Sequence, residues 1–113
     1  MVEWILWEIL FEAGKRRETL YYSEVVKELQ KMEIPIGKGR LAYRKLVGYL
    51  HRVCFYTYNN WKILPGSIIV TKKDKIPSIG YFKFLNQLGV CKGTDLSAWE
   101  REKRRFYEFC RNF

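Results

Sequence analysis

The pattern of hydrophobic and polar positions predicts helices in the first half of the chain. Apolar residues recur at helical spacing over 2–13, and Gly14 is placed to end this first helix. The β-branched and aromatic residues at 19–22 predict a short strand. Ser23 is the expected N-cap of a second helix that reaches about Met32.

A turn at 34–39 leads into a third helix, expected over 38–53, whose two faces differ. On a helical wheel one continuous arc is apolar and holds Ala42, Tyr43, Leu46, Val47, Tyr49, Leu50 and Val53. The opposite face holds Lys38, Arg40, Arg44, Lys45, His51 and Arg52, interrupted only by Leu41 and Gly48. This face has no acidic residue, although solvated helices usually mix Glu with Lys to form i,i+4 pairs. A length of about 24 Å suits the major groove of DNA.

After the third helix the sequence becomes typical of strands. The expected strands cover 55–58, 61–64, 67–71 and 79–84. Asn59 and Asn60 can adopt the positive φ angles of a tight turn, which predicts a first hairpin. The second hairpin is expected to have a basic tip formed by Lys72, Lys73 and Lys75.

A last helix is expected to begin at Ser97, because Ser97 and Glu100 have the spacing of a capping box. One stripe of this helix holds Trp99, Phe106, Cys110 and Phe113. The stripe either closes the core or pairs two copies in a homodimer. Core closure is favoured, since a domain of this size needs most of its aromatic surface inside.

Composition adds a strong positive charge to this picture. Twenty-one Lys and Arg against twelve Asp and Glu give a formal +9 and a pI near 9.6 in 113 residues. Such a charge is the electrostatic signature of a protein that binds a polyanion. A hydrophobic content of 48% excludes a disordered tail and predicts one domain over 1–113.

The cysteines and the apolar segments bear on location. Cys54, Cys91 and Cys110 are an odd number, which disfavours a secreted disulfide scaffold and favours a reducing compartment. The most apolar stretch, 2–11, is about half as long as a membrane span and carries two glutamates. We therefore expect a cytoplasmic protein without a membrane partner.

The sequence does not assemble a catalytic or metal centre. His51 and Cys54 could form a nucleophile–base pair, but both lie on one helix without an orienting group. A zinc site of His51 with the three cysteines lacks the close cysteine pair typical of structural zinc. Glu100 and Glu102 are interspersed with basic residues and are interpreted as solvated charge. No enzyme activity, metal or other cofactor is predicted.

The order of helix, helix, basic helix and basic hairpin predicts an α+β fold, a winged helix-turn-helix domain with a C-terminal helix. Such domains place the recognition helix in the major groove and the wing against phosphates. We expect duplex DNA to be contacted by the basic face of 38–53 and by the wing. A third contact is expected from the basic run that follows the first helix, Lys15, Arg16 and Arg17. The natural role would be a small transcription regulator or a phage or mobile-element DNA-binding protein.

Two segments between 19 and 82 are similar to the DNA-binding domain of alkylguanine alkyltransferase-like proteins. They are Thr19-Leu20-Tyr21-Tyr22-Ser23, entering a short helix, and Arg44-Lys45-Leu46-Val47-Gly48, in the recognition helix. The family's Pro-Cys-His-Arg-Val motif corresponds here to Pro65-Gly66-Ser67-Ile68-Ile69-Val70, so alkyl transfer is not implied. A second pattern resembles small bacterial and prophage proteins and comprises Ile68-Ile69-Val70, Pro77 and Gly80-Tyr81-Phe82. Both resemblances imply only the winged-helix topology.

Two other functions fit the same residues. An RNA-binding protein would use exposed aromatic side chains as stacking platforms, and the candidates are Tyr21, Tyr22, Tyr56, Tyr58 and Trp61. Alternatively, a protein-interaction module or inhibitor would set its basic face against the acidic patch of a nucleic-acid enzyme.

Overall fold

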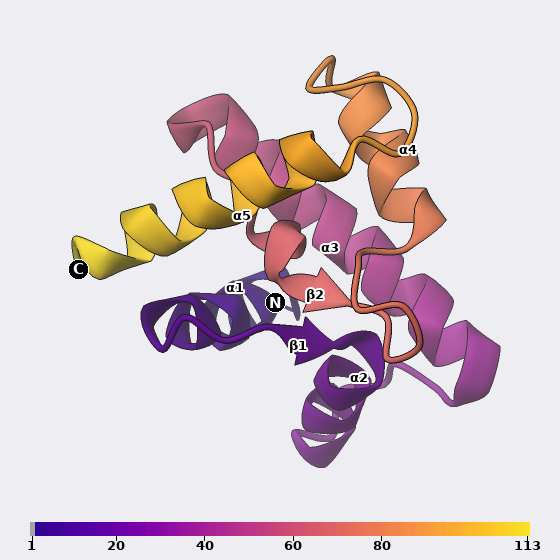
Figure 1. Ribbon diagram of the computed structural model, residues 1–113. Helices are drawn as coiled ribbons and strands as arrows, with labels where there is room; N and C mark the ends of the chain where they lie inside the picture. The colour runs from indigo at the N-terminus through magenta and orange to yellow at the C-terminus, as the bar shows by residue number, and fades with distance from the viewer. Residues whose placement is uncertain (1) are drawn as a thin grey trace.

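The computed structural model describes residues 2–113 and is predominantly helical, with one small parallel sheet (Figure 1). In chain order the elements are α1 (Val2–Lys15), β1 (Leu20–Tyr21), α2 (Tyr22–Lys31), α3 (Gly39–Trp61), the 3-10 turn η1 (Pro65–Ile68), β2 (Ile69–Val70), α4 (Ile79–Gln87) and α5 (Leu96–Arg111). The α+β class is therefore confirmed in outline. The two helices α2 and α3, joined by a turn, are present as expected.

The beginning of α2 is held by a residue other than the predicted Ser23. The backbone of Tyr21 is the N-cap, and its N–H donates to the Glu24 carboxylate at 2.9 Å. Val25 and Leu29 face the core, as the periodicity predicts. The N-cap lies two residues earlier than predicted because β1 runs directly into the helix, which leaves no loop for Ser23 to occupy.

The first predicted hairpin is wrong, because α3 continues without a break through 55–61. Val53, Cys54 and Thr57 extend the buried stripe of the helix by another turn. The Thr57 hydroxyl donates to the carbonyl oxygens of Cys54 and Ile63, at 3.2 and 2.9 Å, and this ties the helix end to the next segment. The helix stops at Lys62, whose φ of 56° is left-handed. Strand propensity here gives way to packing.

The second predicted hairpin, the wing, is also wrong. Of its two expected strands only Ile69–Val70 forms, and it pairs in parallel with Leu20–Tyr21 from before α2. Residues 79–87 form α4 instead, and the Ser78 hydroxyl accepts the N–H of Tyr81 at 3.4 Å as its N-cap. Parallel pairing requires a long crossover, which α2 and α3 supply.

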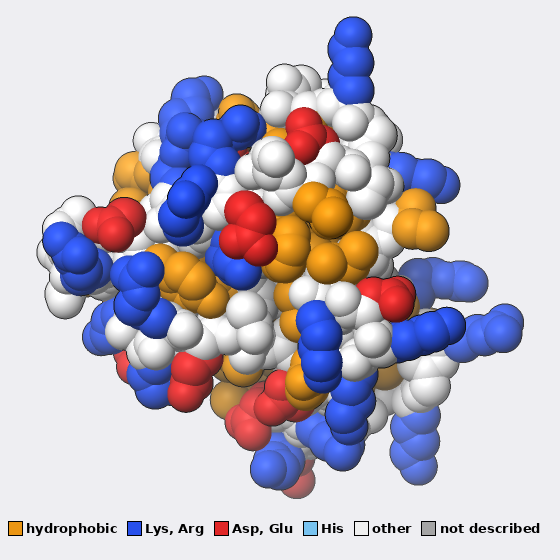
Figure 2. Space-filling view, viewed as in Figure 1, with side chains coloured by type: hydrophobic (Ala, Val, Ile, Leu, Met, Phe, Trp, Pro, Cys, Tyr) orange, Lys and Arg blue, Asp and Glu red, His pale blue; other side chains and the backbone are white. Residues whose placement is uncertain are grey.

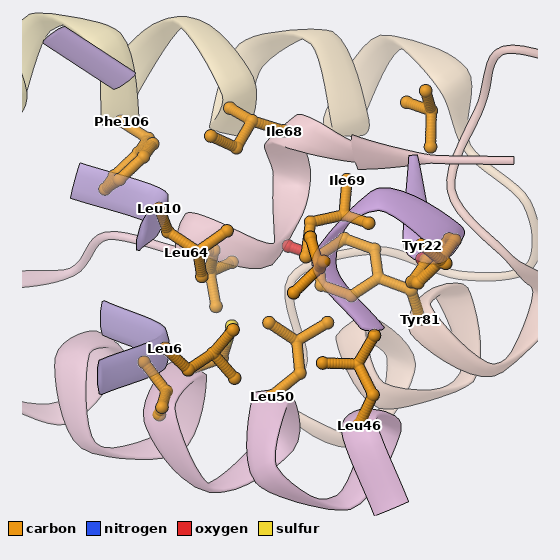
Figure 3. Close-up of a cluster of buried hydrophobic side chains, with 14 of the residues drawn as sticks. Leu6, Leu10, Tyr22, Leu46, Leu50, Leu64, Ile68, Ile69, Tyr81 and Phe106 are labelled. Carbon is orange, nitrogen blue, oxygen red and sulfur yellow. The ribbon is translucent and has the colours of Figure 1, made fainter. Parts of the chain in front are cut away.

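The segment 63–70 lies at the centre of the molecule, and every one of its residues is buried. Figure 3 shows Leu64, Ile68 and Ile69 between side chains of α1 and α3 on one side and Phe106 of α5 on the other. Ser67 joins two further elements, since its hydroxyl lies 2.6 Å from the Tyr81 hydroxyl and its carbonyl accepts the indole N–H of Trp99 at 2.8 Å.

Helix α5 closes the core. Trp99, Phe106 and Cys110 are buried, whereas Phe113 at the end of the predicted stripe is 74% exposed. The capping box at Ser97 is wrong: Asp95 is the N-cap, and its carboxylate accepts the N–H of Ala98 at 3.0 Å. The helix therefore begins one residue before the expected position.

Candidate nucleic-acid interface

The net positive charge of the chain comes from its central segment. Residues 34–94 contain eleven Lys and Arg and one acidic residue, Asp74, for a net +10. The remainder contains ten Lys and Arg against eleven Asp and Glu, for a net −1. The surface formed by α3, α4 and the loop before α4 is therefore basic, while the two ends of the chain are balanced.

The ion pairs follow the same division. Nine are present within residues 2–113, and eight of them join groups that all belong to 2–33 or 95–113. The exception joins Arg52 of α3 to Glu3 of α1. Figure 2 shows Lys and Arg side chains gathered on the side where the 71–78 loop and the start of α3 lie, and mixed signs over α5.

The first half of α3 exposes its predicted basic residues. Arg40, Arg44 and Lys45 are exposed, and so is Lys38 at the N-cap. No acidic residue within 2–113 forms an ion pair with them. Only Lys45 has a polar partner, the carbonyl of Pro35 at 3.4 Å. These four side chains form the α3 basic surface.

His51 and Arg52 belong to the fold more than to this surface. The His51 ring is half-buried and stacks on Phe84 of α4, with centroids 4.4 Å apart, so α4 covers the position that was expected to face a groove. The Arg52 Nε–H donates to Glu3 at 2.8 Å, and the guanidinium lies 5.0 Å from the ring centroid of Tyr49. The sequence pattern could not place either partner, because both pairings bring distant elements together.

The three lysines of the expected wing are carried by a compact loop, 71–78. The loop is closed by two backbone bonds, from Thr71 N–H to the Ile76 carbonyl at 2.8 Å and from Lys75 N–H to the Thr71 carbonyl at 2.9 Å. Lys72, Lys73 and Lys75 are exposed. The ammonium groups of Lys72 and Lys75 lie 5.8 and 4.4 Å from the ring centroid of Tyr21. The three lysines therefore lie together as expected, although they are on a loop and not on a hairpin.

A groove of about 450 Å³ lies between the loop, α2 and the first turns of α3. Its walls are Tyr21, Tyr22, Ser23, Val26, Lys27, Gln30, Gly39, Tyr43, Thr71 and Lys72. Lys27 of α2, which was not predicted as a contact residue, adds a cation to this groove. The only feature of the sequence that could have pointed to Lys27 was its position on the polar face of the second helix.

Lys15, Arg16 and Arg17 lie elsewhere. Each pairs with a carboxylate, Glu12, Glu18 or Glu108, at 3.4, 2.9 and 3.9 Å respectively. They lie at the end of α1 and in the turn after it, at the opposite side of the molecule from the start of α3 (Figure 1). The structure therefore does not bring this run together with the α3 basic surface.

The exposed aromatic side chains are distributed differently from the expected stacking set. Tyr22 is buried, and its hydroxyl accepts the N–H of Ser78 at 3.2 Å. Tyr56 and Trp61 are exposed and line an apolar groove of about 430 Å³ between α1 and α3. The other lining residues are Glu3, Trp4, Trp7, Arg52, Val53 and Thr57. Trp4 and Trp7 were not among the aromatic residues predicted from the sequence.

The thiols and carboxylates occupy separate environments. The Gly66 N–H donates to Cys54 Sγ at 3.3 Å, and burial raises the pKa of Cys54 to about 12, so it is a thiol at neutral pH. Cys110 is buried beside Gly14, and Cys91 lies in the loop after α4. Across 2–113 no three His, Cys, Asp or Glu side chains form a group that could hold a metal. Glu102 is buried between Arg101 and Arg105, so its interpretation as solvated charge is wrong.

None of the helices in the described part of the chain is both long and apolar enough to cross a membrane. Compared with known proteins, the chain matches no family model, no curated protein and no solved structure.

Proposed function

We propose that this domain binds double-stranded DNA through the α3 basic surface and the lysines of the 71–78 loop. The observation that carries the proposal is the separation of charge: a net +10 in 34–94 beside a net −1 in the rest of the chain. If the basic residues served only solubility, acidic residues would be expected among them in this segment as well. A protein that neutralises phosphates gains affinity from such a segment.

Binding DNA through the two exposed arginines in the first half of α3 would not break an ion pair of the described residues. Arg40 and Arg44 form no ion pair within 2–113 that DNA would have to break. Cations that already have a carboxylate partner, such as Arg16 and Arg17, contribute less to a polyanion contact. The two α3 arginines are therefore the first candidates for contacts to bases and phosphates.

The shape of α3 supports insertion into a groove. The helix has 23 residues, a length of about 34 Å. Its outward face over the first half carries Leu41, Arg44, Lys45 and Gly48, and no bulky element lies over Gly48. A turn and a shorter helix, α2, precede it, which is the order of a helix-turn-helix unit. The 71–78 loop would take the place of the wing and contact phosphates.

One observation favours a second candidate, binding of single-stranded RNA. Tyr56 and Trp61 are exposed and their rings meet edge to face, with centroids 5.7 Å apart. Exposed aromatic rings stack unpaired bases, which a duplex does not offer. The groove they line has a single ion pair, Glu3–Arg52, at its rim and lacks the excess of cations found on the α3 basic surface.

The experiment is an equilibrium titration of fluorescent 20-mers, as duplex DNA, single-stranded DNA and single-stranded RNA, at several salt concentrations. The proposal predicts tighter binding to the duplex and a log–log salt slope of about −3 to −6, one phosphate contact for each participating cation. Preference for single strands with quenching of tryptophan fluorescence would favour the RNA candidate. Absence of binding to all three would contradict both and favour a protein partner.

A further inference from the structure

Gly48 occupies the middle of α3 without a structural reason within the domain. A helical glycine costs about 1 kcal/mol relative to alanine. Two other glycines are required by packing, because a Cβ at Gly14 would lie 2.5 Å from Cys110 Sγ and one at Gly66 would lie 2.8 Å from a Tyr81 ring carbon. A Cβ at Gly48 would meet no atom of residues 2–113 within 4 Å. Gly48 is partly exposed, and a methyl group would fit there without a clash, so packing among the described residues does not require the glycine.

The position of Gly48 relative to the basic residues suggests that explanation. On the helical wheel Gly48 lies opposite the buried stripe that contains Leu46 and Leu50. Arg44 and Lys45 precede it by four and three residues, so all three share the outward face. The surface of α3 is therefore lowest at Gly48, where no side chain projects, and two cations lie one turn before it.

The residues seven positions away extend this line. Leu41 and Phe55 are exposed on the same outward side, on either side of Gly48 along the helix. This outward side of α3 could also pack against α3 of a second copy of the chain. Arg44, Lys45 and Arg52 would then face like charges from the other copy, which disfavours a homodimer and favours a polyanion.

We infer that Gly48 is the point of closest approach between α3 and the sugar–phosphate backbone of duplex DNA. This inference rests on the proposed function. The missing side chain lets the strand lie against the helix backbone, where Arg44 and Lys45 reach phosphates on either side. A methyl group at this position would hold the strand away and lengthen both contacts.

The test compares Gly48→Ala with Gly80→Ala in thermal unfolding and in duplex titration. Gly80 is a matched control, because it is helical and a Cβ there makes only an ordinary contact of 3.8 Å with Ser78 Oγ. Gly48→Ala should raise Tm by about 3–5 °C and weaken duplex affinity about tenfold. Gly80→Ala should leave duplex affinity unchanged.

The outcomes separate this inference from the proposed function. Equal duplex affinity for wild type and Gly48→Ala overturns the inference alone. A lower Tm for Gly48→Ala also overturns it, since the glycine would then have a role inside the domain. If wild-type protein binds no duplex, the proposed function fails and the inference fails with it. A wild-type dimer that Gly48→Ala dissociates would assign the position to a helix–helix contact instead.

Discussion

The imidazole ring of His51 lies nearly parallel to the phenyl ring of Phe84, with centroids 4.4 Å apart and planes inclined by 13°. The contact joins the middle of α3 to α4. Burial lowers the pKa of His51 below its ordinary value of 6.5, because a proton would place a charge in this half-buried stack. The only histidine of the chain therefore serves packing and favours the neutral ring.

Folding stability should consequently fall as pH is lowered from about 7.5 to about 5.5. Well above pH 6.5 the histidine is neutral in both states. As the pH falls through 6.5 the unfolded chain binds the proton first, because the folded pKa is lower. Urea unfolding of wild type and His51→Phe over this range measures the effect. The variant keeps an aromatic stack without a titrating group, so it should show a weaker pH dependence. Identical dependence in both proteins would contradict the assignment.

The three thiols should react at different rates. Burial raises the pKa of Cys54 to about 12 and that of Cys110 to about 11, whereas Cys91 is partly exposed in a loop. Reaction requires the thiolate and access, so a thiol-specific reagent should modify one group quickly in the native protein and all three in denaturant. Cys91→Ser should abolish the fast phase. Rapid modification of two or three native thiols would show that the core is open.

Crowding at Gly66 gives a stability prediction opposite in sign to that for Gly48. A Cβ at Gly66 would lie 2.8 Å from a Tyr81 ring carbon and 3.1 Å from Cys54 Sγ, at the centre of the core. Gly66→Ala should therefore destabilise the fold by about 1–3 kcal/mol, measured by urea unfolding. Unchanged stability would mean that η1 can shift and that the central segment is loosely packed.

The sequence predicted α1, α2, α5 and the first half of α3, but it predicted strands where the rest of α3 and α4 form. The first half of α3 was predictable because Ala42, Leu46 and Leu50 repeat at helical spacing over several turns. The segment 55–61 is rich in aromatic residues, which favour strands as an isolated pattern. The competing signal was the continued spacing of Val53, Cys54 and Thr57, which extends the same buried stripe.

Residues 79–87 illustrate a second limit. Tyr81, Phe82, Phe84 and Leu85 are buried at i, i+1, i+3 and i+4, a helical spacing that the aromatic content masked. The parallel pairing of Leu20 with Ile69 joins segments almost fifty residues apart, and no local sequence pattern predicts such a contact. The exposed basic positions of α3 were predictable for the opposite reason: exposure follows from the helix period alone.

The loop lysines should contribute affinity without sequence preference. Lys72→Glu with Lys73→Glu should weaken binding to different 20-base-pair duplexes by the same factor, because phosphate contacts carry no sequence information. Loss of two phosphate contacts should also make the log–log salt slope shallower by about two units. An unchanged slope would remove the 71–78 loop from the interface.

The most direct test of the central claim is charge reversal on α3, Arg40→Glu with Arg44→Glu, measured by duplex titration. Both side chains are exposed, so stability should change by about 1 kcal/mol or less, and circular dichroism verifies the fold. Arg104→Glu with Arg111→Glu on α5 is the control, since it changes the net charge equally at a surface of mixed sign. The α3 variant should bind duplex at least about a hundredfold more weakly than the α5 variant. Equal affinity of the two variants would contradict the assignment of α3 as the DNA-binding helix.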